Sequence, residues 1–104
     1  MKQEIKLISQ HYGKERLIRQ GISCCAVLIQ VFNKMLDSNA NERRELDEEI
    51  NDAFVDQVSC LQIVTDSLAD TFGMDCQINY KRKLLLKTLI RSAKQEIIHE
   101  HETK

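Results

Sequence analysis

The chain has 104 residues, of which 42% are hydrophobic and 30% charged, with three glycines and no proline. A chain of this length has room for one core, and its apolar fraction is too high for a disordered protein, so we expect a single domain over residues 1–104. The scarcity of Gly and Pro argues against a β-sandwich or barrel and favours an all-α fold. The net charge of −1 gives no reason to expect nucleic acid or an anionic membrane as a partner.

The chain shows no apolar segment of signal-peptide length near its start, and its longest apolar run, residues 24–29, is far shorter than the roughly 20 residues of a membrane span. We therefore expect a cytoplasmic protein. The four cysteines form no C-x-x-C pair and lie in apolar segments: Cys24, Cys25, Cys60 and Cys76. Reduced, buried thiols that act as small hydrophobic side chains are favoured over a disulfide or a zinc site.

Two helices are predicted in the first third of the chain. A short helix over residues 2–11 places Ile5 and Ile8 inward, and a longer one covers residues 14–36. The longer helix carries two apolar seams, each with residue spacings of 4, 3, 4, 3 and 4. The first seam consists of Ile18, Ile22, Cys25, Ile29, Phe32 and Leu36. The second lies one residue earlier and consists of Leu17, Gly21, Cys24, Leu28, Val31 and Met35. Such a wide apolar face is typical of a helix in the middle of a bundle or shared with another subunit.

A third helix is predicted over residues 42–72, with Gly73 as its stop signal. Its carboxylates Glu45, Glu49, Asp52 and Asp56 fall at spacings of 4, 3 and 4, so they line one stripe of the helix. Like charges stacked in this way repel one another, and either water on an exposed face or a bound cation offsets the repulsion. Both interpretations of the acidic stripe stay open.

The last predicted helix covers residues 77–100 and is basic, and residues 99–104 are expected to fray. Leu85 or Leu86, Leu89, Ala93 and Ile97 are predicted to face inward. Its first half carries the candidate phosphate contacts Tyr80, Lys81, Arg82, Lys83 and Lys87. The same cations are also suited to salt bridges with the acidic middle of the chain, because residues 37–76 contain two basic and eleven acidic side chains.

Several motifs together resemble the small MazG-like nucleoside triphosphate pyrophosphohydrolases. They are His11-Tyr12-Gly13-Lys14-Glu15, Leu28-Ile29-Gln30, Leu46-Asp47-Glu48-Glu49-Ile50-Asn51-Asp52-Ala53 and Tyr80-Lys81, in family order over residues 11–94. The resemblance implies an oligomeric helical bundle of about four helices, a dimer or tetramer. It also implies that Glu49 and Asp52 are magnesium ligands, with Glu45 and Asp56 as further candidates.

In that family an E-x-x-E pair on the preceding helix completes the magnesium site. Here Cys24 and Val27 occupy the two corresponding positions. Valine has no donor atom, and a thiolate is a poor ligand for magnesium, which prefers oxygen. The chain is therefore predicted to be a catalytically impaired member that binds or sequesters a phosphorylated nucleotide, or a nucleotide signal, without turnover. Two alternatives stay open, which are a metal-dependent pyrophosphohydrolase and a regulatory module that binds protein without nucleotide.

Overall fold

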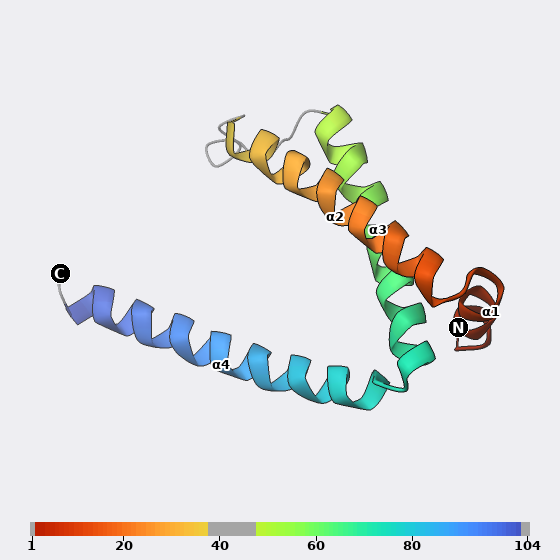
Figure 1. Ribbon diagram of the computed structural model, residues 1–104. Helices are drawn as coiled ribbons and strands as arrows, with labels where there is room; N and C mark the ends of the chain where they lie inside the picture. The colour runs from red at the N-terminus through yellow and green to blue at the C-terminus, as the bar shows by residue number, and fades with distance from the viewer. Residues whose placement is uncertain (1, 38–47, 103–104) are drawn as a thin grey trace. The chain divides into compact units, whose positions relative to one another are not determined.

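The computed structural model describes residues 2–37 and 48–102, with side chains to residue 100 (Figure 1). These residues form the helices α1 (Lys2–Tyr12), α2 (Lys14–Asp37), α3 (Glu48–Phe72) and α4 (Asp75–Glu102). The described ranges contain helices and no strand, so the all-α prediction is confirmed. The chain divides into two compact units, residues 1–72 and residues 73–104, which are described separately. The single domain therefore stays a prediction. The predicted start of the third helix, residue 42, lies outside the described residues.

Glycines in the left-handed conformation end α1 and α3. Gly13 has a φ of 78°, and its amide donates a hydrogen bond of 3.1 Å to the carbonyl of Ser9, which closes the last turn of α1. Gly73 follows α3 with a φ of 65°. An L-residue with a side chain adopts this conformation at a cost, so glycine fixes both helix ends, and the predicted stop at Gly73 is confirmed.

One of the two α2 seams forms the core of the first unit. Leu17, Cys24, Leu28 and Val31 are 1–6% exposed, and Val64 and Ala69 of α3 complete the buried apolar set. The other seam is exposed: its large members Ile18, Ile22, Ile29, Phe32 and Leu36 range from 42% to 79%. Because neighbouring residues on a helix are rotated by about 100°, one seam packs on α3 while most of the other faces outward, and Phe32 of the exposed seam still meets α3 with one side of its ring.

The helices α2 and α3 form an antiparallel pair. A Cβ atom at Gly21 would lie 3.4 Å from Cγ1 of Val64, and the rings of Phe32 and Phe54 meet edge to face with centroids 6.2 Å apart. Advancing along α2 therefore means moving back along α3. The glycine allows the two helices to approach closely at this level.

The short helix α1 packs on both α2 and α3. The predicted inward residues Ile5 and Ile8 are half-buried, and Ser9 is buried with its hydroxyl donating to the carbonyl of Lys6 at 3.0 Å. On α3, the fully buried Ser67 donates a hydrogen bond of 2.8 Å to the carbonyl of Ile63. These local bonds satisfy the buried hydroxyls without a partner from another helix.

The prediction that the apolar stripe of the last helix faces inward is wrong for this structure. Leu85, Leu86, Leu89 and Ile97 of α4 are 52–65% exposed, and Ala93 is exposed as well. The second unit contains a single helix, and one helix cannot bury its own apolar stripe. None of the described helices combines the length and apolar character that a membrane crossing requires.

Substitutions at Gly21 test the close approach of α2 and α3. We expect Gly21→Ala to raise the free energy of unfolding by about 0.5–1 kcal/mol, because a methyl group fits at van der Waals distance from Val64 and alanine favours the helix. We expect Gly21→Leu to lower it by about 1–3 kcal/mol through overpacking. Urea unfolding followed by circular dichroism measures both changes. A leucine variant as stable as the unsubstituted protein would show that the helices do not pack closely there.

Candidate functional site

The predicted acidic stripe lies on the first half of α3. Glu49, Asp52 and Asp56 are exposed there, three or four residues apart, so they share one side of the helix. Glu45 lies outside the described residues. Among residues whose placement is described, no group of three or more His, Cys, Asp or Glu side chains is arranged to hold a metal ion.

The α2 positions where the resemblance places the missing pair carry no oxygen donors. Cys24 is 1% exposed and belongs to the core, and Val27 is half-buried. A magnesium ion held between two helices needs hard oxygen ligands from both. The side chains that α2 offers therefore do not fit magnesium, although the α3 carboxylates are of the right type.

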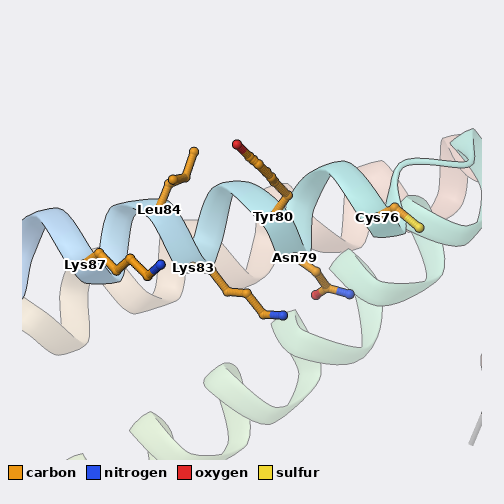
Figure 2. A pocket seen from close by; sticks show the side chains of 6 residues that line it. All are labelled: Cys76, Asn79, Tyr80, Lys83, Leu84 and Lys87. Carbon is orange, nitrogen blue, oxygen red and sulfur yellow. The ribbon is translucent and has the colours of Figure 1, made fainter.

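A shallow groove along α4 gathers three of the five predicted phosphate contacts. It measures about 480 Å³ and is lined by Cys76, Asn79, Tyr80, Lys83, Leu84 and Lys87 (Figure 2). Tyr80 and Leu84 project to one side of the helix, Asn79 and Lys83 project to another, and Lys87 extends along the helix (Figure 2). Asn79 and Cys76 were not among the predicted phosphate contacts, although they lie one turn before Lys83 and Tyr80.

The other two predicted phosphate contacts are placed differently. Lys81 lines an adjoining surface together with Tyr80, whereas Arg82 lines neither groove. Successive residues on a helix point in different directions, so the run of cations at residues 81–83 is spread around α4. Lys83 and Lys87 are four apart and stay together. The groove lining therefore combines two ammonium groups, an amide and a tyrosine ring, which are groups suited to an anion that carries an aromatic group.

A thiol cluster lies between α2 and α3. The side-chain amide of Gln20 lies 3.7 Å from the sulfur of Cys24 and 3.7 Å from that of Cys60. Burial raises the pKa of the Cys24 thiol, and a hydrogen bond with Cys60 raises it further. Cys24 therefore remains a neutral thiol near neutral pH.

The prediction of four buried thiols is correct for Cys24 alone. Cys60 is half-buried, and Cys25 and Cys76 are exposed. Cys25 follows the core residue Cys24 by one position, so it is turned away from α3, and Cys76 lies in the first turn of α4, whose side chains are exposed. All four are free cysteines.

A second groove, of about 620 Å³, lies where α1, α2 and α3 meet. Its lining is mostly apolar and consists of Ile8, Tyr12, Arg16, Leu17, Gln20, Cys60, Ile63 and Val64. The guanidinium carbon of Arg16 lies 5.0 Å from the centre of the Tyr12 ring, which is a cation–π contact. No sequence motif marks this groove, because its lining comes from three helices.

Comparison of the chain with protein-family models, with curated proteins and with solved structures finds no match.

Two neighbouring substitutions test whether the α2 surface that would hold a metal is part of the core. We expect Cys24→Glu to lower the free energy of unfolding by at least about 3 kcal/mol, because it buries an unpaired carboxylate. The control Cys25→Glu places the same charge on an exposed position and should change it by no more than about 0.5 kcal/mol. Thermal and urea unfolding measure both. Equal stability of the two variants would contradict the burial of Cys24.

Proposed function

We propose that this protein binds a phosphorylated nucleotide, or a nucleotide-derived signal, and releases it unchanged. The observation that supports this proposal most directly is the α4 groove, whose lining includes Tyr80 and the lysines Lys83 and Lys87, which are one turn apart. The ammonium groups hold phosphate oxygens, and the half-exposed tyrosine ring offers a face on which a base stacks. The resemblance to MazG-like proteins supports the same ligand class.

Binding without hydrolysis follows from the chemistry of α2. Phosphoryl chemistry of the MazG type needs a divalent cation held by carboxylates from two helices, and α2 supplies a buried thiol and a valine instead. The exposed carboxylates Glu49 and Asp52 then form a solvated acidic surface. In this proposal the protein acts in the cytoplasm as a nucleotide buffer, sensor or sequestering agent.

We further propose that the protein is a homo-oligomer, a dimer or tetramer, whose copies meet on the exposed seam of α2. Five large apolar side chains line this seam at helical spacing, and soluble monomers rarely expose an apolar stripe of this length. An oligomer also explains how a groove on one helix becomes a closed site, because all the residues that line it come from α4. A second helix is needed to cover a bound nucleotide.

Nucleotide binding is tested on the α4 groove. We expect the double substitution Lys83→Gln/Lys87→Gln to weaken nucleotide affinity about tenfold or more, because it removes two charge-assisted contacts. The control Arg91→Gln/Lys94→Gln removes the same charge from the same helix, outside the groove, and should change affinity by less than about threefold. Isothermal titration with individual nucleotides measures both. Native mass spectrometry after incubation with a nucleotide mixture identifies the ligand by its mass.

Three results would contradict this proposal. Equal loss of affinity in the two double variants would show a general charge effect and no site in the groove. Accumulation of monophosphate and pyrophosphate would show turnover. Absence of any bound nucleotide below millimolar concentration would favour the second candidate function, a module that binds protein through the exposed α2 seam without nucleotide.

The oligomer is tested by placing a charge on that seam. We expect Ile22→Lys/Ile29→Lys to dissociate the oligomer, because both side chains are more than 60% exposed and would lie at the interface between copies. The control Ser23→Lys/Gln30→Lys adds the same charge to another exposed side of α2 and should leave the oligomer intact. Size-exclusion chromatography with light scattering, with and without nucleotide, reports the mass. An unchanged mass in the first variant would place the interface elsewhere.

A further inference from the structure

The two most buried of the four thiols face each other across the α2–α3 contact. One donor, the side-chain amide of Gln20, lies 3.7 Å from each sulfur, so the sulfurs of Cys24 and Cys60 lie around the same nitrogen. Cys60 is also among the groups that raise the pKa of the Cys24 thiol. They lie one helical turn from Gly21 and Val64, where a Cβ atom on the glycine would come within 3.4 Å of the valine. This close approach of the helices brings one cysteine from each of them to the same side-chain amide.

The two cysteines differ in their access to solvent. Cys60 is half-buried and lines the groove between α1, α2 and α3, together with Gln20 and Arg16. Cys24 is 1% exposed and lies behind it in the core. A small reagent that enters the groove therefore reaches Cys60 first. The thiol of Cys24 is then the neighbouring nucleophile for an oxidised Cys60 sulfur.

We propose that Cys24 and Cys60 form a reversible dithiol–disulfide pair, an oxidation site that links α2 to α3. The oxidant is a small hydroperoxide. The Cys60 sulfur attacks the peroxide oxygen, so that Cys60 becomes a sulfenic acid and the hydroperoxide is reduced to the alcohol, or to water if it is hydrogen peroxide. The Cys24 sulfur then attacks the Cys60 sulfur, the S–S bond forms, and the sulfenic oxygen leaves as water with the Cys24 proton. Two thiols lose two hydrogens in total.

The order of these two steps follows from the surroundings of each sulfur. Burial keeps Cys24 protonated and slow to attack a peroxide by itself, whereas Cys60 is only half-buried and lines the groove that a small peroxide can enter. A disulfide requires its two Cα atoms to lie within about 7 Å of each other. The glycine at the helix contact favours this distance. The oxidised pair would tie together the two longest helices of the first unit.

The experiment uses the full chain with the double substitution Cys25→Ser/Cys76→Ser, which leaves only the proposed pair. Both replaced cysteines are exposed. We expect hydrogen peroxide to lower the intact mass of the subunit by about 2 Da and a dithiol reductant to reverse the change. We also expect the thermal unfolding midpoint to rise by about 10 °C or more in the oxidised form. A matched control adds Cys60→Ser, which leaves Cys24 alone and should show neither change.

Other outcomes overturn the proposal. Mass gains of one to three oxygens without the loss of two hydrogens would show independent thiols, and disulfide-linked subunits would show that the thiols pair between chains. Should the double variant fail to fold, the Cys25→Ala variant replaces it. Its peroxide-treated form is then digested after aspartate, which separates Cys60 from Cys76. A cross-linked peptide pair that contains Cys24 and Cys60 supports the proposal, and any other pairing refutes it.

Discussion

The contact between α2 and α3 determines the structure of the first unit. A glycine on α2 meets Val64 of α3 at van der Waals distance, and this approach buries Cys24 and Leu28 within the same interface. The short helix α1 packs against both of these helices. Every buried apolar side chain among the described residues belongs to α2 or α3. A change that separates the two helices would therefore remove the core, because the described chain has no second buried layer to replace it.

The same contact limits the chemistry that is possible between the helices. A magnesium site would require carboxylates on the side of α2 that carries Cys24, but that side is packed against α3, where an unpaired charge costs several kcal/mol. A well-packed core and a complete carboxylate cage cannot both occupy this position. In this chain the position is part of the packed core. The proposed function is therefore binding by α4 and no hydrolysis between α2 and α3.

The sequence predicted the helices well and the buried surfaces less well. The sequence pattern predicted the ends of the first two helices to within about one residue. The two α2 seams have identical spacing, so periodicity alone did not tell which one packs on α3. The small residues Gly21 and Cys24 decide it, because they allow the close approach. For α4 the apolar stripe was predicted to be buried, yet the compact unit that contains it has no other helix to cover it.

The two candidate sites also differ in how much of each could be predicted from the sequence. The pairing of Lys83 with Lys87 follows from their spacing on one helix, and the divergence of Lys81 and Arg82 follows from the same geometry. By contrast, the thiol pair depends on which residues of α2 and α3 lie opposite one another. That register comes from tertiary packing, and no local pattern around Gln20 indicates that its amide lies between sulfurs from two helices. Contacts between helices are the part of this site that the sequence alone did not provide.

In the proposed assembly, α4 could add a second contact beside that of the α2 seam without losing its ligand groove. Residues two apart on a helix point to nearly opposite sides, so Leu85 and Leu89 lie opposite the groove formed around Lys83 and Lys87. A partner that covers the exposed leucines would therefore leave the lysines open to an anion. In such an assembly, burial of those leucines would contribute roughly 1.5–3 kcal/mol per side chain, and the cost of collecting positive charge on the other side would be offset when phosphate binds. In this proposal α4 offers Leu85 and Leu89 to a partner and Lys83 and Lys87 to a ligand, so the two contacts do not use the same side chains.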